Sequence, residues 1–485
     1  MQVSKNKKFY ITTSIAYTNS NPHIGFALEI IQADVLARYY RILGKKVFFS
    51  TGTDEHGAKV VRAAEGARKK PKEFVNEISK KYKNLTQILS ISNDDFIRTT
   101  DKKRHWSAVE KIWLKLKENN DIYKKQYKGF YCIGCEAFIT KKDLKNGRCI
   151  IHQKEPEMIE EENYFFKLSK YSKQIEKIIV GNKIRIIPSS RKNELLNFIK
   201  QGLEDISFSR PRKDLKWSIP VPNDSLASIY VWADALSNYI SVLDYVKNNA
   251  KFKKFWPADV HCIGKDILKF HALIWPAMLL SLKLPLPKTI FIHGFITVNG
   301  QKISKSLGNT INPFELVEKY GTDAVRYFLL REIPPTEDGD FTYEKFEQRY
   351  NADLANGLGN LVARVVALAN KIKSQKLKVK ITSQNSKIIK NTWKKYHKAL
   401  NEFKFNEVLI SIWELISFCD KYIEKEKPWE NKNQKLKTKN QKVIINLLFI
   451  LNEIAKLLEP FLPETSENIL KQLKTKKNKI LFPRI

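Results

Sequence analysis

The spacing of apolar residues predicts strands and helices in alternation over the first part of the chain. Residues 9–17 form a nearly continuous apolar run, which indicates a buried strand. A polar turn follows, and a short apolar run within residues 45–53 indicates a second strand. Between the two runs, apolar residues recur at the spacing of one helical face: Ile24, Leu28, Ile31 and Val35. The opening segment therefore predicts strand, helix and strand.

The same alternation returns beyond residues 127–165, a stretch rich in glycine, cysteine and charged turns. Residues 259–264 and 288–294 predict two further strands, and the apolar segment 265–282 between them predicts a helix. Repeated alternation of this kind is typical of a doubly wound parallel sheet. We therefore predict an α/β fold with a Rossmann-type doubly wound parallel sheet that is interrupted by an insertion.

The last part of the chain, from about residue 344, shows helical periodicity only. A polar, low-complexity segment at 431–442 is interpreted as a connector. The longest apolar stretch, 443–462, contains Asn446 and Glu453, so it predicts an amphipathic helix and no membrane span. This part of the chain is therefore predicted to be an all-α helical bundle.

Composition adds expectations about partners and location. The 485 residues carry a formal net charge of +35, which favours a polyanionic partner such as nucleic acid. Lysine, asparagine and isoleucine are abundant everywhere, so compositional bias explains part of that charge equally well. Five cysteines are too few for a disulfide framework and indicate a reducing, cytoplasmic location. The amino terminus passes almost directly into a strand-like run, which leaves no room for a signal peptide.

Two short segments carry residues that suit a nucleotide. His23 stands where a helix begins, and the free N–H groups at a helix start attract phosphate. Lys302 and Lys305 lie in a glycine-bounded loop, where two cations can close over a triphosphate. Each signal alone also fits a structural histidine or a lysine-rich surface loop. The P-loop pattern GxxxxGK[ST] does not occur in the sequence.

In order along the chain, these segments resemble the motifs of one enzyme class. PHIGFALE (22–29) and KISKSLGN (302–309) resemble the HIGH and KMSKS motifs of class I aminoacyl-tRNA synthetases. Four further blocks make the chain similar, nearly end to end, to the methionyl-tRNA synthetase family: TGTDEHG (51–57), YVWADALSNYI (230–240), IGKDILKFHALIWPAML (263–279) and FIHGFITVNGQKISKS (291–306). The resemblance implies that ATP and L-methionine form methionyl-adenylate with release of pyrophosphate. The methionyl group is then transferred to the 3′-terminal adenosine of tRNA(Met), both initiator and elongator.

The resemblance also implies which residues handle ATP, a substrate that is expected with Mg²⁺. Those implied to act in catalysis are His23, Lys302 and Lys305. Those implied to bind ATP are His23, Gly25, Asp266, His293, Gly294, Lys302, Ser304 and Lys305. Phe26 departs from the family, because it stands where the second histidine of HIGH is usual.

A second group of residues is implied to form the methionine pocket. These are Ile15, Tyr17, Asp54, Trp232, Leu236, Tyr239, His271 and Trp275. Asp54 is expected to hold the α-ammonium group, while aromatic rings suit a polarisable thioether. The seven-residue spacing of Trp232 and Tyr239 predicts one helical face for both. The four-residue spacing of His271 and Trp275 predicts the same for that pair.

Two knuckles in the insertion have the spacing of a zinc site. The four candidate ligands are Cys132, Cys135, Cys149 and His152. Two C-x2-C/H pairs separated by a short loop are typical of tetrahedral zinc, with redox or structural thiols as the lesser alternative. The set resembles the single-zinc version of the family's connective insertion, which implies one structural Zn²⁺.

Four residues of the helical part match positions that read the methionine anticodon in the family: Asn356, Asn360, Arg364 and Trp429. Amide, guanidinium and indole groups suit the reading of splayed bases. The alternative is an amphipathic helix with polar outer positions and a tryptophan packed at a helix start. No oligonucleotide-binding module follows at the end of the chain, so we expect a monomer.

The resemblance also divides the chain into segments. They are a first half of the catalytic domain (1–116), the connective insertion with its zinc knuckle (117–209), the second half of the catalytic domain (210–295), the KMSKS loop and stem-contact region (296–343) and the helical anticodon-binding domain (344–485).

Two other functions remain open at this point. One is a class I synthetase for another amino acid, with cysteine the closest in size. The other is a tRNA-binding paralogue without activation activity, which Phe26 supports because a phenyl ring cannot donate a hydrogen bond to phosphate. Loss of one such charge-assisted bond costs about 1.5–3 kcal/mol, or about ten- to a hundredfold in rate. That cost slows an enzyme without abolishing it.

Overall fold

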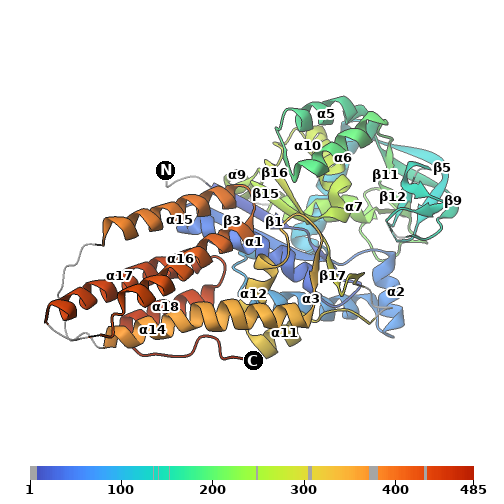
Figure 1. Cartoon of the computed structure of the whole chain (residues 1–485). Coiled ribbons are helices and arrows are strands. Elements are labelled where there is room, and N and C mark those ends of the chain that lie inside the picture. Colours follow the sequence, from blue (N-terminus) through green and yellow to red (C-terminus); the bar gives the residue numbers. More distant parts are fainter. Residues whose placement is uncertain are drawn as a thin grey trace. The chain divides into compact units, whose positions relative to one another are not determined.

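The computed structural model (Figure 1) describes residues 8–134, 136–139, 141–151, 153–246, 250–303, 308–370, 381–430 and 434–485. The chain forms two compact units. The first takes in residues 1–22, 40–86 and 92–293, and the second takes in residues 23–39, 87–91 and 294–485. Within the described ranges, no helix combines the length and the apolar character that crossing a membrane requires.

Seven strands of the described chain form a sheet in the first unit. Their order is β10 (Arg185–Ile187), β16 (Thr289–His293), β15 (Val260–Gly264), β1 (Lys8–Thr13) and β3 (Lys46–Asp54), with β2 (Ala16–Tyr17) and β4 (Asp95–Arg98) both paired to β3. Every pairing in this sheet is parallel. The predicted doubly wound sheet is confirmed, although the apolar run at 9–17 is divided between β1 and β2.

The strand order reverses beside β1. From β1 the chain proceeds to β3 and β4 on one side, whereas β15 and β16 lie on the other side. In open α/β sheets, ligands bind beyond the carboxyl ends of the strands where the order reverses. The residues that follow β1, β3 and β15 therefore occupy the expected ligand position.

Helices and strands of this unit share one large apolar core. The described α-helices that begin in the unit are α2 (Ala58–Gly66), α3 (Pro71–Ile88), α4 (Ser107–Glu118), α5 (Ser172–Val180), α6 (Ser189–Lys200), α7 (Val231–Leu236), α8 (Asn238–Ser241), α9 (Ala250–Phe255) and α10 (Trp275–Ser281). Tyr10 of β1 and Trp275 of α10 are both buried in the core. Gly52 permits β3 to approach β4, because a Cβ there would lie 2.0 Å from the carbonyl oxygen of Ile97.

The insertion is built mainly from antiparallel strands. β5 (Ile122–Cys132) pairs with β9 (Glu157–Phe166), and β6 (Ala137–Ile139) and β11 (Ile206–Ser207) complete a four-stranded sheet. Two further strands, β7 (Leu144–Lys145) and β8 (Arg148–Cys149), form a small hairpin. Cys149 at the end of β8 and Cys132 at the end of β5 are buried in one apolar cluster with Ile139.

A small sheet begins the carboxyl-terminal part of the second unit. β17 (Ile296–Val298) pairs with β18 (Gln301–Lys302) and with β19 (Gly339–Phe341). Asn299 and Gly300 join the first two strands with φ angles of 52° and 73°. A two-residue turn in this left-handed region matches the twist of a hairpin and favours asparagine and glycine. The sequence pair Asn-Gly therefore fixes the strand that leads into the KMSKS-like segment.

The rest of the second unit is helical, as predicted. Besides α1 (Ile24–Ile42), of which residues up to 39 belong here, its described helices are α11 (Pro313–Tyr320), α12 (Thr322–Arg331), α13 (Tyr343–Arg349), a π-helix (Tyr350–Gly359), α14 (Asn360–Asn370), α15 (Ser383–Asn401), α16 (Phe405–Glu426), α17 (Gln434–Leu458) and α18 (Pro463–Thr475). Figure 1 shows helices α14 to α18 lying lengthwise beside one another.

One prediction about this bundle is wrong. The segment 431–442, interpreted as a connector, is helical from Gln434 onward as the first part of α17. Lysine and glutamine are good helix formers, and their polarity conceals this propensity from a reading of apolar periodicity. Tertiary contacts add support, since Asn440 is buried and Lys439 lies 2.9 Å from the carboxylate of Glu426.

A buried ion pair fastens α1 to the bundle within the second unit. Asp34 of α1 lies 2.8 Å from Arg326 of α12, and both side chains are 0% exposed. The Arg326 guanidinium also donates to the carbonyl oxygens of Leu89, Pro460 and Phe461. A buried guanidinium whose N–H groups have acceptors on all sides is held rigidly in place. The helix that begins beside His23 is therefore anchored to the turn between α17 and α18.

Candidate active site

Asp54 is the last residue of β3, at the edge of the sheet where a ligand is expected. Its side chain is buried, and the backbone N–H of His56 lies 3.5 Å from its Oδ1. Burial raises the pKa of this carboxyl well above its usual range, and the nearby Asp234 and Glu136 carboxylates raise it further. An ionised carboxylate in this position needs a cation, so the site is suited to an ammonium group.

Tyr17 and Glu136 form a second polar group beside this strand end. The Tyr17 hydroxyl donates to Glu136 Oε2 at 2.7 Å, and Glu136 Oε1 accepts the backbone N–H of Lys59 at 2.9 Å. Gly57 makes this approach possible, because a Cβ there would lie 2.3 Å from the Tyr17 hydroxyl and its φ is 116°. Glu136 belongs to the insertion, so the insertion contributes to the surroundings of Tyr17.

The predicted methionine residues form an aromatic group within the first unit. His271 donates from Nδ1 to the carbonyl oxygen of Ile267 at 2.9 Å, so its Nε2 accepts the Tyr239 hydroxyl at 2.6 Å. The rings of Tyr239 and Trp275 have centroids 5.9 Å apart. Trp232 stacks on Phe270 with centroids 3.7 Å apart and an interplanar angle of 12°.

The two remaining apolar members lie against the same core. Leu236 is fully buried in α7, and Ile15 is half-buried between β1 and β2. The predicted shared helical face is only partly right for Trp232 and Tyr239, because they occupy the separate short helices α7 and α8. Ser237 separates the two helices but keeps helical dihedral angles (φ −66°, ψ −15°), and its hydroxyl donates to the carbonyl oxygen of Ala233.

Two predicted ATP residues follow neighbouring strands of the sheet. Asp266 is exposed just beyond β15, and His293 is buried at the end of β16. A Cβ on Gly264 would lie 2.8 Å from Asp266 Oδ1 and 3.7 Å from His293 Nε2. The two side chains therefore face one small region over the backbone of Gly264, which a larger residue would fill.

His23 and Gly25 belong to the second unit and form the start of α1. His23 Nδ1 accepts the backbone N–H of Gly25 at 3.1 Å, which is a capping interaction at the helix start. The N–H of Ile24 donates to the carbonyl oxygen of Ile311 at 3.3 Å. Phe26, the departure from the HIGH pattern, is 9% exposed and therefore packs inside the protein.

The structure describes only part of the KMSKS-like segment. Lys302 ends β18, and its side chain lies outside what the structure describes. Ser304 and Lys305 also lie outside the described residues. Gly294 leads into β17, and a Cβ there would lie 2.1 Å from the carbonyl oxygen of Glu337. The predicted ATP residues are thus divided between the two units, with Asp266 and His293 in the first.

The four predicted anticodon residues all belong to the second unit. Asn356 accepts a hydrogen bond from Arg484 Nε at 2.9 Å, and Asn360 is exposed at the start of α14. Arg364 pairs with two carboxylates of α16, Glu424 at 2.5 Å and Asp420 at 3.5 Å. Trp429 is 41% exposed in the turn after α16, so it is not packed at a helix start as the alternative interpretation supposed.

Half of the predicted zinc set can be located. Cys132 ends β5 and Cys149 ends β8, while Cys135 and His152 lie outside the described residues. Among the residues that are described, no group of three or more histidine, cysteine or acidic side chains is placed to hold a metal. The structure therefore shows two of the four candidate ligands as buried thiols in one apolar cluster.

The sequence did not predict a buried polar row behind Asp54. Asp234 lies between two imidazoles, with Oδ2 2.7 Å from His56 Nδ1 and Oδ1 2.6 Å from His105 Nε2. His105 Nδ1 in turn lies 2.8 Å from the Ser241 hydroxyl. His56 and Asp234 stand in the family-like blocks, but their pairing needs contacts between residues 178 positions apart.

Comparison with known proteins identifies the family. The model described as "tRNA synthetases class I (M)" matches residues 9–143 and 135–366, and the "Anticodon-binding domain of tRNA ligase" matches residues 385–483. The chain belongs to the methionyl-tRNA synthetase family. The methionine–tRNA ligase of Clostridium perfringens is 46% identical over 97% of this chain and 74% of its own length. That of Thermotoga maritima is 44% identical over 96% of this chain and 75% of its own length.

A solved structure supports the same assignment. Mycobacterium tuberculosis methionyl-tRNA synthetase in complex with methionyl-adenylate is 33% identical, and the match covers 99% of this chain and 98% of that chain with a TM-score of 0.90. The apo form of that enzyme gives a TM-score of 0.84 at 30% identity. The chain therefore has the class I catalytic core with a helical anticodon-binding domain.

Proposed function

We propose that this chain is a methionine–tRNA ligase, which activates L-methionine with ATP and transfers it to tRNA(Met). The observation that carries the proposal is the pairing of a buried Asp54 at the end of β3 with the aromatic group around Tyr239 and His271. A carboxylate and an aromatic wall within one unit suit the two ends of methionine, its α-ammonium group and its thioether. Methionyl-adenylate, which the Mycobacterium tuberculosis relative binds, is the corresponding intermediate.

Methionine binding is assigned to Ile15, Tyr17, Asp54, Trp232, Leu236, Tyr239, His271 and Trp275. Asp54 takes the ammonium group, because a cation offsets the desolvation of its carboxylate. His271, whose Nδ1 is fixed by Ile267, holds the Tyr239 hydroxyl in one orientation. The Tyr239 and Trp275 rings then contact the side chain of the substrate. A polar amino acid of similar size would place its side-chain polar group against these rings without a hydrogen-bond partner, so it binds less well than methionine.

ATP binding and phosphate chemistry are assigned to His23, Gly25, Asp266, His293, Gly294, Lys302, Ser304 and Lys305. His23 presents Nε2 towards phosphate while its Nδ1 is engaged by the Gly25 N–H. Asp266 suits the ribose hydroxyls, and the lysines offset charge that develops as pyrophosphate leaves. Mg²⁺, when bound with ATP, adds further neutralisation of the phosphates.

A structural zinc is assigned to Cys132, Cys135, Cys149 and His152. The burial of the two described cysteines in one cluster supports this set. Four thiolate and imidazole ligands leave no open position, so zinc when bound stabilises the insertion and takes no part in the reaction. We expect one zinc per chain in protein purified without chelator, and its absence would refute the assignment.

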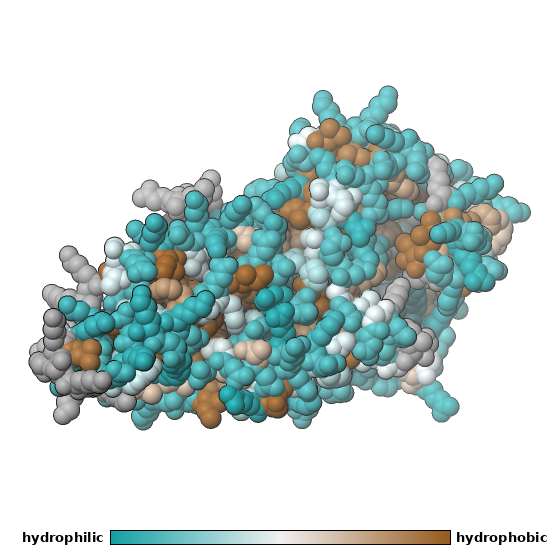
Figure 2. Space-filling view, in the orientation of Figure 1, coloured by the Kyte–Doolittle hydropathy of each residue, from teal (hydrophilic) through white to brown (hydrophobic). Residues whose placement is uncertain are grey.

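Recognition of tRNA(Met), initiator and elongator, is assigned to Asn356, Asn360, Arg364 and Trp429. The exposed Trp429 ring offers a stacking surface. Arg364 leaves its two carboxylates at little cost, because partly exposed ion pairs contribute about 0–1 kcal/mol. We also propose that the chain is divided into the five segments named from the sequence. Its proposed location is the cytoplasm, and its proposed state is a monomer. Figure 2 shows hydrophilic residues over most of the visible face, with hydrophobic ones scattered among them.

ATP–pyrophosphate exchange with a panel of amino acids tests this function. Exchange that depends on methionine and not on cysteine is the expected result. Exchange with cysteine alone would identify a different class I synthetase. Silence with every amino acid, in protein whose helical content and cooperative unfolding are normal, would favour a tRNA-binding paralogue.

A further inference from the structure

A buried hydrogen-bonded row connects three distant segments of the first unit. It runs from Ser241 in α8 to His105, Asp234 in α7 and finally His56, which follows β3. The side chains of His56, His105 and Asp234 are at most 2% exposed. His105 Nε2 and His56 Nδ1 both donate to Asp234, so each carboxylate oxygen has one imidazole partner.

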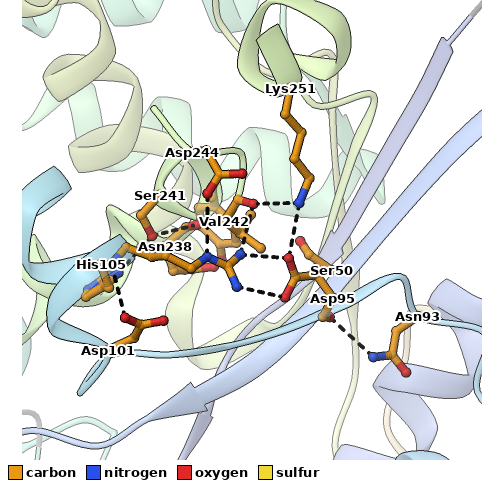
Figure 3. A network of polar contacts seen from close by, with 12 residues as sticks. Ser50, Asn93, Asp95, Asp101, His105, Asn238, Ser241, Val242, Asp244 and Lys251 are labelled. Atoms are coloured by element: carbon orange, nitrogen blue, oxygen red, sulfur yellow. Dashed lines mark hydrogen bonds and ion pairs between the residues drawn. The ribbon is translucent and has the colours of Figure 1, made fainter. Parts of the chain in front are cut away.

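The outer end of the row is fixed by its own surroundings. His105 lies in a π-helix (Lys102–Trp106) whose first N–H groups are capped by Asp101. Figure 3 shows Ser241 beside His105, and next to them a second cluster that contains Asp95 and Lys251. Arg104 joins that cluster through Asp95, 2.7 Å from its Nη2. On the side away from Asp234, His105 is therefore held by the Asp101 cap of its helix and by Ser241, whereas the Asp95 cluster, within the described residues, makes no bond to the row.

The inner end of the row adjoins the predicted ammonium site. The His56 ring lies edge-on to Trp106 and Trp217, with centroids 5.7 Å and 5.9 Å away. Trp217 also donates to the carbonyl oxygen of Glu55 at 2.6 Å. The backbone of residues 54–56 is therefore fixed from two sides, by the His56 side chain and by Trp217.

The middle of the row holds the helix that carries the predicted pocket wall. Asp234 stands in α7 between Trp232 and Leu236, and α8 with Tyr239 follows directly. A displacement of Asp234 would therefore move this wall relative to the end of β3. Asp234 also adds a negative charge near Asp54, which strengthens the attraction for an ammonium group in a low-dielectric site.

We propose that Asp234 is a positioning residue for methionine, held between His56 and His105 so that the Asp54 segment and the α7–α8 wall keep the separation that the substrate requires. The inference rests on the proposed function, because it names the support of the same binding site. Asp234 acts through its neighbours and is not assigned a contact with the reacting atoms. Positioning errors of this kind weaken binding and rate even when no contact with substrate is removed.

The test is the variant Asp234→Asn, measured by ATP–pyrophosphate exchange and by quenching of tryptophan fluorescence on titration with methionine. The asparagine amide has the shape of the carboxylate, but one of the two oxygens is replaced by an NH2 group. That NH2 group is a donor and faces the N–H donor of one imidazole, so one hydrogen bond of the row is lost. We expect the KM and Kd for methionine to rise about tenfold or more, with the KM for ATP changed less than about twofold. A lower melting temperature with unchanged methionine KM and Kd would overturn the proposal.

Two further variants make the result specific. Asp95→Asn removes a carboxylate held by Arg104 and Lys251 in the same unit, and it is expected to lower stability without changing the methionine KM. His105→Gln leaves the bond between Asp234 and His56 intact and is expected to raise the methionine KM less than Asp234→Asn does. If Asp234→Asn does not fold, His105→Gln decides alone, and a methionine KM equal to wild type overturns the proposal. Wild-type exchange is measured first. Its absence refutes the enzyme assignment, and the methionine Kd from fluorescence then tests this inference by itself: a Kd that Asp234→Asn leaves unchanged overturns it.

Discussion

Each unit of the molecule buries an aspartate between two basic side chains, but the bases differ. In the second unit, Asp34 lies 2.8 Å from both Arg38 and Arg326. In the first unit, Asp234 lies between two imidazoles at 2.6 and 2.7 Å. A guanidinium is charged at every relevant pH, whereas an imidazole is not.

The difference separates a structural attachment from a support for binding. Burial would raise the pKa of Asp234, but His56 and His105 outweigh that effect and hold it below its usual value. The carboxylate thus stays ionised beside the predicted ammonium site. Asp34 faces permanent cations within the second unit, so its negative charge is matched there and serves packing. A buried carboxylate informs about function only when its counter-charge and its surroundings are known.

The largest expected effect in this comparison is on stability. Arg326→Met removes the guanidinium and leaves Asp34 with Arg38 alone, together with three unpaired carbonyl oxygens. We expect the free energy of unfolding to fall by about 3–5 kcal/mol, because the variant breaks a buried ion pair, leaves the Asp34 charge only partly compensated and removes the donor from three buried carbonyl oxygens. Urea denaturation measures it, and Arg349→Met, which breaks a partly exposed pair with Glu332, is the matched control. A loss of free energy of unfolding below about 1 kcal/mol would contradict the structural role of Asp34 and with it the contrast to Asp234.

The next effect combines activity and stability at Asp54. Asp54→Asn is expected to lower methionine-dependent exchange at least about a hundredfold, or about 2.7 kcal/mol, since the amide carries no charge for the ammonium group. At pH 8 the free energy of unfolding of the same variant is expected to exceed that of wild type by about 1–2 kcal/mol, so the variant unfolds at a higher denaturant concentration. A binding residue that costs stability is typical of sites selected for function.

The sign of that stability gain follows from the pKa. Because the folded-state pKa of Asp54 is raised, the folded protein binds more protons than the unfolded chain, and wild-type stability falls as pH rises above the ordinary aspartate value. The difference between wild type and Asp54→Asn should therefore be large at pH 8 and shrink towards pH 4. A difference that is independent of pH would show that the carboxylate is not the cause.

The smallest expected effect is at Phe26. Phe26→His restores the HIGH pattern, and we expect the exchange rate to rise by up to about tenfold or to stay equal, with methionine binding unchanged. Because Phe26 is buried, the polar ring should also cost about 1–2 kcal/mol of stability. Stopped-flow activation and thermal unfolding measure the two effects. A large fall in rate would mean that the packing of Phe26 shapes the start of α1.

The sequence predicted the fold where its signals are local and strong. Long apolar runs gave β1, β3, β15 and β16, and helical repeats gave the bundle. It missed β4, a strand of four residues that contains Asp95 and Arg98, because charged side chains conceal a short strand in the sheet. It also missed the beginning of α17, where lysine and glutamine carry helix propensity without apolar periodicity.

The candidate site was predictable only as a set of residues. Family-like blocks named Asp54, Tyr239 and His271, since each block is contiguous. The Asp234 row could not be read in the same way, because its partners lie 178 and 129 positions away and are joined only by the folded sheet. The role of Glu136, which comes from the insertion to bind Tyr17, depends on the same long-range geometry.

Aminoacylation tests the central claim most directly. The purified chain is incubated with ATP, Mg²⁺ and an initiator or elongator tRNA(Met) transcript, and each of the twenty amino acids is supplied in labelled form in turn. We predict that methionine alone becomes esterified to the 3′-terminal adenosine of both transcripts, and that Asp54→Asn lowers the rate of this reaction at least about a hundredfold. Charging with a different amino acid, or stable tRNA binding without any charging, would contradict the account.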